Sequence, residues 1–309
     1  MPGSTLSPHS PQARVAASLF VAILILGAAI FLLIACLVCY SLVRYRARAG
    51  AGEPRQTFGS PRLETIWTAI PLVLVTAIFI VTVRAMALID APDQPGRPPD
   101  LVVTGHQWWW QARYPNGAVT AGEIHIPAGK RLLVQIESAD VIHDFWVPEL
   151  ARKMDAVPGR SGYIWLEADA PGTYDGRCSE FCGTQHAWMH FIVVADPEAA
   201  FSVWLSHQAE PAATTAAEPA AQGAILFQQK KCGDCHAISG TAARGASAPD
   251  LTHVASRQFL GSGISRNTLE NLALWSASPQ SIKPGNRMPD QVLTPAERTA
   301  IAAYLETLR

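Results

Sequence analysis

The sequence predicts a membrane protein of three parts: a two-helix transmembrane hairpin, an all-β sandwich and an all-α C-terminal domain. Two long apolar runs lie within the first 89 residues. Short alternating runs fill residues 100–196, and residues 223–309 carry helical patterns. Only 16% of the 309 residues are charged, against about 25% in ordinary soluble domains, so a wholly soluble protein is disfavoured.

Residues 1–90 form the predicted hairpin, with helices at about 15–43 and 64–89. Each run is long enough for a bilayer, which takes ~20 residues, and the first exceeds the ~7–15 apolar residues of a signal peptide. The short loop between them carries only basic charge apart from Glu53: Arg44, Arg46, Arg48, Arg55 and Arg62. The positive-inside rule makes this loop cytoplasmic and places both chain ends outside.

Two cysteines, Cys36 and Cys39, lie in the first apolar run. A lipoprotein cleavage site at Cys36 is one interpretation, but the apolar run continues past it to Val43. We therefore interpret both cysteines as helix-packing residues.

Residues 91–207 form the predicted sandwich, and residues 91–99 (APDQPGRPP) are expected to lead the chain out of the membrane. Short strand-like runs separated by Gly, Pro and Asp are typical of antiparallel sandwiches. Residues 208–222 are an Ala/Pro linker of low complexity. Residues 223–309 form the helical domain, whose last helix opens with Thr294-Pro295-Ala296-Glu297, a capping box with proline at the first helical position.

The densest set of candidate metal ligands is Cys178-Ser-Glu-Phe-Cys182-Gly-Thr-Gln-His186-Ala-Trp-Met189, together with the upstream His143. Two thiolates, two imidazoles and a thioether form a soft set that suits copper. Two cysteines with three residues between them on one loop can bridge two copper ions. A structural Cys2His2 zinc site is a second interpretation, which leaves Met189 without a role. A disulfide between Cys178 and Cys182 is a third.

A haem-attachment motif lies in the C-terminal domain at Cys232-Gly-Asp-Cys235-His236. The two thiols of C-x-x-C-H form thioethers with haem, and the histidine is the proximal iron ligand. Met288 is the expected sixth ligand, with His253 as the alternative. Phe227 is expected to pack near Tyr304 of the last helix.

Several motifs together resemble cytochrome c oxidase subunit II: Glu64-Thr-Ile-Trp-Thr68, Gly105-His-Gln-Trp-Trp-Trp110, His143-Asp-Phe-Trp-Val-Pro148 and the run from Cys178 to Met189. The resemblance covers about residues 15–205 and implies a cupredoxin-like Greek-key sandwich with a binuclear copper A centre. Residues 223–309 resemble a class I cytochrome c domain carrying covalent haem c.

The resemblance implies a role for each matching residue. Copper A would be bound by His143, Cys178, Cys182, His186, Met189 and the backbone carbonyl of Glu180. The Glu180 side chain would also reach a magnesium ion shared with the catalytic subunit. Trp108 would accept electrons, and Glu64 would lie at the mouth of a proton pathway, although an acid there also suits a helix N-terminus.

Strand geometry bears on Trp108 independently of the resemblance. In a strand, residues 108 and 110 share one face and 109 takes the other, so at least one ring is expected to meet solvent or a partner. His106, His125, His190 and His207 match no ligand position and are expected to be structural.

The resemblance implies the electron-input subunit of a bacterial plasma-membrane oxidase. Its partners would be catalytic subunit I, subunit III and an external donor, either cytochrome c or a quinol–cytochrome c reductase. In the family that the sequence resembles, loss of the two copper-binding cysteines marks the quinol-oxidising members. Cys178 and Cys182 are both present here, which disfavours a quinol-oxidising role. A copper A nitric oxide reductase subunit and a free-standing membrane-tethered electron carrier are the alternatives.

The net charge differs between the predicted sandwich and the predicted C-terminal domain. Residues 90–207 hold eight Lys/Arg and fifteen Asp/Glu, whereas residues 223–309 hold nine and six. The sequence has no dense stripe of basic residues of the kind that binds nucleic acid. Opposite net charges joined by a flexible linker predict that the C-terminal domain docks on the sandwich, and we expect that docking to be transient.

Overall fold

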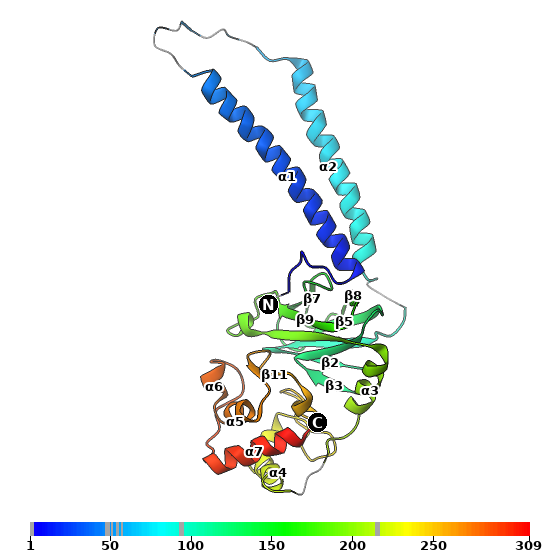
Figure 1. The fold of residues 1–309 in the computed structure, drawn as a ribbon, viewed down its shortest axis with the longest axis vertical. Coiled ribbons are helices and arrows are strands. Elements are labelled where there is room, and N and C mark those ends of the chain that lie inside the picture. The colour runs from blue at the N-terminus through cyan, green and yellow to red at the C-terminus, as the bar shows by residue number, and fades with distance from the viewer. Residues whose placement is uncertain are drawn as a thin grey trace. The chain divides into compact units, whose positions relative to one another are not determined.

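The computed structural model describes residues 3–46, 50, 52, 53, 56, 58–92, 96–213 and 217–309. Contacts divide the chain into two compact units. One is Arg14–Asp90, and the other joins Ala91–Arg309 with Met1–Ala13 at the start of the chain (Figure 1). Arg48 and Arg55 of the basic loop, residues 93–95 of the first linker and residues 214–216 of the second lie outside the described residues.

The first unit consists of helices α1 (Pro11–Arg44) and α2 (Pro61–Ile89), as expected. Their most apolar windows reach mean hydropathies of 3.2 and 2.5, and almost none of those side chains is buried. Such a continuous exposed apolar surface is unstable in water and suits lipid. Pro71 lies inside α2, where a membrane helix tolerates it.

The sandwich is made of two five-stranded sheets. The first has the order β3-β2-β1-β5-β8, and the second has the order β4-β10-β9-β6-β7. Most neighbouring strands pair antiparallel, as expected. Two pairs depart from that expectation, because β1 runs parallel to β5 and β4 runs parallel to β10. The cupredoxin-like sandwich of two sheets is nevertheless confirmed. The strands are β1 Leu101–His106, β2 Trp109–Arg113, β3 Val119–Ala121, β4 Glu123–Pro127, β5 Leu132–Ser138, β6 His143–Trp146, β7 Met154–Ala156, β8 Gly162–Leu166, β9 Gly172–Cys178 and β10 His190–Asp196.

Aromatic side chains fill the space between the two sheets next to the ligand residues. Trp110 of β2 meets Phe145 of β6 at 5.5 Å and Phe191 of β10 at 5.7 Å between ring centroids. All three are buried. This packing fixes the strand ends from which the candidate ligands project, since aromatic pairs add specific geometry to apolar burial.

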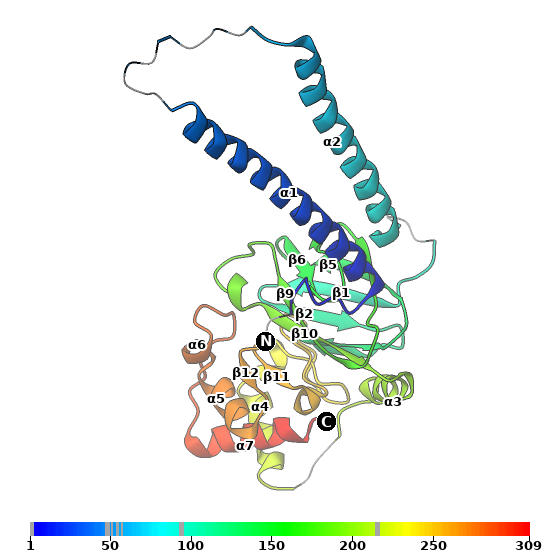
Figure 2. The same cartoon turned by 45° about the horizontal axis from the view of Figure 1, so that its top comes forward.

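A helix that the sequence reasoning missed, α3 (Glu198–Gln208), follows β10 and lies beside β4 and β10 (Figure 2). Its Trp204 stacks on His125 at 4.0 Å and meets Tyr114 at 5.3 Å. Its apolar residues lie directly before the Ala/Pro linker, and the sequence reasoning assigned no element to them. Phe201, Trp204 and Leu205 pack against the core of the sandwich.

The C-terminal domain contains α4 (Ala220–Gln229), α5 (Leu269–Ala277), α6 (Pro279–Ile282) and α7 (Pro295–Thr307), with a short hairpin of β11 (Phe259–Leu260) and β12 (Ser265–Arg266). The capping box of α7 is present: Glu297 N–H donates to Thr294 Oγ1 at 3.2 Å, and Thr294 N–H donates to Glu297 Oε2 at 2.7 Å. Phe227 packs edge-on against Tyr304 at 5.8 Å, as expected.

Part of the expected linker is ordered. Ala212 is buried, and its N–H donates to Ser239 O at 3.1 Å. Helix α4 begins at Ala220, three residues before the expected start of the domain. Residues on both sides of 214–216 are therefore held by contacts of the fold.

Helix α4 crosses α7 at Gly223, and this close approach yields the first prediction. A Cβ atom at Gly223 would lie 1.9 Å from Ala300 O and 2.8 Å from Tyr304 Cβ. Gly223→Ala should lower the stability of the domain by about 1–3 kcal/mol, because the two helices must separate. Scanning calorimetry of the purified protein should show a lower melting temperature for this domain.

The matched control is Gln222→Ala, one residue earlier on the exposed side of the same helix. Alanine is at least as good a helix former as glutamine, so this variant should melt like the unchanged protein. Equal melting temperatures for Gly223→Ala and Gln222→Ala would contradict the close helix crossing.

Candidate metal centre and haem-binding cavity

One loop of the sandwich carries most of the candidate metal ligands. Cys178 is the last residue of β9, and Met189 directly precedes β10. The N–H of Cys178 donates to Met189 O at 3.0 Å, so the two ends of the loop are held together. His186 opens the short 3-10 helix η1 (His186–Trp188) within this loop, and His143 begins the neighbouring strand β6.

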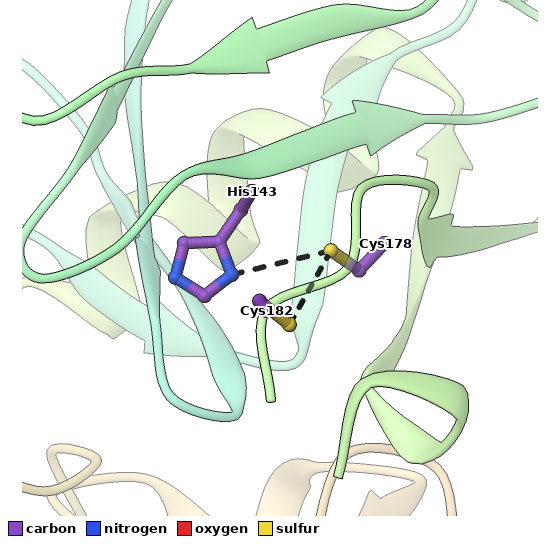
Figure 3. A group of neighbouring side chains, drawn as sticks. All are labelled: His143, Cys178 and Cys182. Carbon is purple, nitrogen blue, oxygen red and sulfur yellow. Dashed lines mark hydrogen bonds between the residues drawn. The ribbon is translucent and has the colours of Figure 1, made fainter. Parts of the chain in front are cut away.

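The sulfur atoms of the loop converge. Cys178 Sγ and Cys182 Sγ lie 3.8 Å apart, and Met189 Sδ lies 3.8 Å from Cys182 Sγ. A disulfide has an S–S length of about 2.05 Å, so the disulfide interpretation does not describe this arrangement. Met189 is 1% exposed, and its thioether faces the thiols. Figure 3 shows both cysteines and His143 pointing toward one another.

Two imidazoles and one carbonyl complete the ligand set. His143 Nδ1 lies 4.0 Å from Cys178 Sγ, and His186 Nδ1 lies 3.7 Å from Cys182 Sγ. The carbonyl of Glu180 lies 3.2 Å from Cys178 Sγ. All six expected copper ligands are therefore brought to one place. Three of them, His143, Cys178 and Cys182, have ligand atoms within 4.8 Å of one another.

A carboxylate orients the buried His143 ring. His143 Nε2 donates to Asp140 Oδ1 at 2.8 Å, which leaves Nδ1 free to face the thiols. A hydrogen bond from the second ring nitrogen to a carboxylate is the usual support of a metal-binding histidine. Burial acts to raise the pKa of Asp140, but hydrogen bonds from His143 and from the N–H groups of Gln107 and Val141 hold it below its ordinary value. Asp140 is therefore ionised.

The two neighbouring thiols differ in acidity, and Cys178 is the one that gives up its proton more readily. The pKa of Cys178 is lowered, first because Cys182 donates a hydrogen bond to it and also because His143 does. The pKa of Cys182 is raised by the neighbouring thiol and by burial. A thiolate at Cys178 is the form that binds a metal ion.

The donor set fits copper better than zinc. Structural zinc takes four ligands, whereas five side chains and a carbonyl converge here, and the thioether of Met189 is a ligand that soft copper accepts. Two cysteines held side by side can each contact two ions. The residues present thus fit a binuclear copper centre.

A second site lies in the C-terminal domain, where the haem motif borders an apolar cavity. Cys232, His236 and Met288 all line this cavity. The remaining lining residues are mostly apolar: Phe227, Lys230, Leu272, Trp275, Ser276, Gln291, Leu293, Ile301 and Leu305. An apolar cavity with a thiol, an imidazole and a thioether on its walls fits a covalently attached haem.

The ring of His236 is oriented for iron binding. Its Nδ1 lies 2.6 Å from Pro249 O and donates to it, which leaves Nε2 available. Burial lowers the pKa of His236, so the imidazole is neutral, as a metal ligand must be. Cys235, the second thiol of the motif, is exposed.

Met288, rather than His253, faces this cavity. His253 is buried, but its Nε2 lies 3.0 Å from Glu210 O and the residue is not part of the cavity wall. The geometry therefore favours the thioether as the sixth ligand.

Trp108 does not lie in a strand, so the face-sharing argument for residues 108 and 110 is wrong. β2 begins at Trp109, and Trp108 occupies the turn before it. The chain turns sharply there, and the indole N–H of Trp108 donates to Cys182 O at 3.0 Å. Trp108 thus touches the backbone of Cys182, an expected copper ligand, while Trp109 and Trp110 are buried.

Gln107 is a functional neighbour that sequence reasoning missed. Its side-chain N–H donates to Cys182 O at 2.7 Å, beside the Trp108 bond. It stands within the quoted Gly105–Trp110 motif, but a glutamine between aromatic residues carries no distinctive signal. Asp140, three residues before His143, was also missed, because a single aspartate in a loop carries no distinctive signal either.

Two further expectations concern Glu64 and His125. Glu64 lies in the first turn of α2, where a negative charge also favours the helix dipole, so its place in a proton pathway stays a prediction. His125 Nδ1 lies 2.7 Å from Asp196 Oδ2, and His125 Nε2 lies 3.0 Å from Glu123 Oε1. Both ring nitrogens have carboxylate partners, so His125 has the structural role that was expected.

Known proteins match each part of the chain. Residues 7–84 match the transmembrane domain of cytochrome c oxidase subunit II, residues 118–196 match its periplasmic domain, and residues 220–309 match cytochrome c. Cytochrome c oxidase subunit 2 of Alkalihalophilus pseudofirmus is 34% identical, over 99% of this chain and 91% of that protein. The chain belongs to the cytochrome c oxidase subunit II family.

Other similar proteins include cytochrome c oxidase subunit 2 of Bacillus subtilis, 32% identical over 87% of this chain and 82% of that protein. Quinol oxidase subunit 2 of Bacillus cereus is 31% identical over 68% of this chain and 74% of that protein. The crystal structure of the periplasmic domain of subunit II from Bradyrhizobium japonicum is 31% identical, covers 36% of this chain and 95% of that chain, and has a TM-score of 0.34.

Family membership and geometry agree on the cofactors. The subunit II match implies copper A in the sandwich, where the soft ligands converge, and the cytochrome c match implies haem c in the cavity of the C-terminal domain. The membrane location of the subunit II family likewise agrees with the two apolar helices.

The copper ligands give a second prediction. Cys182→Ser should reduce bound copper from about two ions per chain to well under one, because this thiol faces both Met189 and His186. Elemental analysis of the purified protein measures the ratio. Cys36→Ser, which changes a thiol in the membrane helix, should retain full copper, and equal copper loss in both variants would contradict the assignment.

The haem ligands give a third prediction. Met288→His should keep the haem attached but lower its reduction potential by tenths of a volt, because axial ligands set haem potentials over roughly 0.8 V and methionine raises them. Redox titration of the haem absorbance measures this shift. A potential that falls in His253→Gln instead would show that His253 is the ligand.

Proposed function

We propose that this subunit II is the electron-input subunit of a haem–copper terminal oxidase. Electrons would arrive at haem c, pass to copper A and continue to a separate catalytic subunit that reduces oxygen to water with proton translocation. The observation that carries the proposal is the convergence of six copper ligands in a chain that also carries a haem-attachment motif beside an apolar cavity.

The protein's own residues hold the two centres with little freedom to move. Asp140 fixes the His143 ring, and Pro249 O fixes the His236 ring. Gln107 and Trp108 both donate to Cys182 O, which holds the ligand loop against the turn before β2. When bound, copper and haem supply one-electron redox chemistry, and a rigid ligand set favours rapid transfer because little has to rearrange.

Two residues next to the copper ligands are candidates for contact with the catalytic subunit. The Glu180 side chain is exposed although its carbonyl faces the thiols, so its carboxylate is available for a shared magnesium ion. Phe181 beside it is 76% exposed, so a catalytic subunit that reaches Glu180 would also cover this apolar ring.

The oxygen-reducing site belongs in a partner. No histidine occurs in the sequence of the two apolar helices Pro11–Arg44 and Pro61–Ile89, so these helices have no imidazole to bind a haem. We propose subunit I as the partner that reduces oxygen, with subunit III beside it. Glu64, at the start of α2, is proposed as an acid at the mouth of a proton pathway into subunit I.

The remaining proposals concern location and electron supply. The basic loop between the helices is proposed to face the cytoplasm of a bacterial cell, which places the sandwich and the C-terminal domain outside the plasma membrane. The external donor is proposed to be cytochrome c or a quinol–cytochrome c reductase. Trp108 is proposed as the residue through which electrons enter the copper centre.

Oxygen uptake by the complete complex tests this function and gives a fourth prediction. The protein purified with its membrane partners should consume oxygen with a reduced cytochrome as donor, and cyanide should stop the uptake. Cys182→Ser should abolish uptake, whereas Cys36→Ser should retain it. No uptake by a complex with full copper and haem would contradict the oxidase function and favour nitric oxide as the acceptor.

A further inference from the structure

The sandwich and the C-terminal domain contact each other directly within one compact unit. Two loops of the C-terminal domain, residues 261–263 and 283–287, meet two parts of the sandwich. These are the turn at Gln107 and Trp108 and the loop of residues 178–189, called the copper loop below. Ser262 Oγ donates to Trp108 O at 2.8 Å. Gln185 Nε2 of the copper loop donates to Pro284 O. The interface therefore forms beside the expected copper ligands, at residues next to them in the same loop and turn.

A lysine is buried at the centre of this interface. Lys283 is 3% exposed, and its Nζ donates to Trp188 O at 2.9 Å, to Gly261 O at 3.0 Å and to Trp108 O at 3.4 Å. An ammonium group has three N–H donors, and three carbonyl oxygens receive them. Two of these carbonyls belong to the sandwich and one to the C-terminal domain.

This arrangement is complete only when the two domains are docked. If the domains separated, the ammonium group would lose its charge-assisted hydrogen bonds to Trp108 O and Trp188 O. Of the three carbonyl partners, only Gly261 O would remain. Lysine is almost never fully buried without partners, because an unpaired buried charge is costly. Burial lowers the pKa of Lys283 to about 8, so the side chain still carries its charge at neutral pH.

We infer that Lys283 is a positioning residue that fixes the C-terminal domain on the Trp108 turn and the copper loop. The docking is therefore built into the fold, in place of the transient encounter expected from opposite charges and a flexible linker. The ordered contact of Ala212 with Ser239 and a second domain contact, from Gln258 N–H to Glu123 Oε2 at 2.9 Å, hold the same arrangement.

The docked arrangement connects the two candidate redox sites, and this consequence rests on the proposed function. Arg287 directly precedes Met288, and its guanidinium donates to Gln107 Oε1. Gln107 in turn donates to Cys182 O at 2.7 Å. Two hydrogen bonds thus link the neighbour of a haem ligand to the backbone of a copper ligand, and Lys283 keeps that link in place.

Lysine acetylation of the complete, cofactor-loaded complex tests the docking without measuring activity, and this is the fifth prediction. With acetyl N-hydroxysuccinimide, mass spectrometry should find Lys283 labelled at least tenfold more slowly than Lys130, an exposed lysine of the sandwich. The protection should persist at high salt, which screens a transient electrostatic encounter. Labelling of Lys283 at the rate of Lys130, at low or high salt, would overturn the inference.

A matched pair of variants tests the role of Lys283 itself. In Lys283→Met, amide hydrogen exchange in residues 107–110 and 184–189 should rise several-fold, because the domains then separate. Lys130→Met removes the same charge and should leave exchange unchanged. Unchanged exchange in Lys283→Met would overturn the positioning role. Copper and haem contents of the same samples report on the proposed function separately.

Discussion

The hydrogen bond from Cys178 N–H to Met189 O is the constraint on which the metal centre depends. It continues the antiparallel pairing of β9 with β10, in which Arg177 faces His190. The pairing therefore turns a segment with four potential ligand side chains into a closed loop. β6 pairs with β9 on its other side and carries His143 to the same end of the sheet. Sheet register, more than the loop sequence, decides that the ligands meet.

A second layer of contacts makes this loop rigid. Asp140 orients His143, while Gln107 and Trp108 hold the carbonyl of Cys182. Through the same turn the copper loop meets the C-terminal domain, at Lys283. One short segment before β2 therefore supports the ligands and also forms the docking surface. Because the same segment contacts both domains, the fold would set the distance between the proposed copper and haem centres.

Patterns that are local in sequence predicted much of the structure. The apolar runs gave the helices α1 and α2, and Thr294 with Glu297 gave the start of α7, because bilayer length and capping are short-range constraints. The candidate copper ligands and the haem-attachment motif were visible because rare side chains stand at fixed spacings. The turn at Trp108, helix α3 and the burial of Lys283 were not visible, because each depends on contacts with residues distant in sequence.

Copper-edge X-ray absorption of the purified full chain, together with elemental analysis, tests the central claim most directly. The account predicts two copper ions per chain that share two sulfur ligands, with nitrogen and a further sulfur donor nearby. A single zinc ion, or one copper ion bound by one cysteine sulfur, would contradict it.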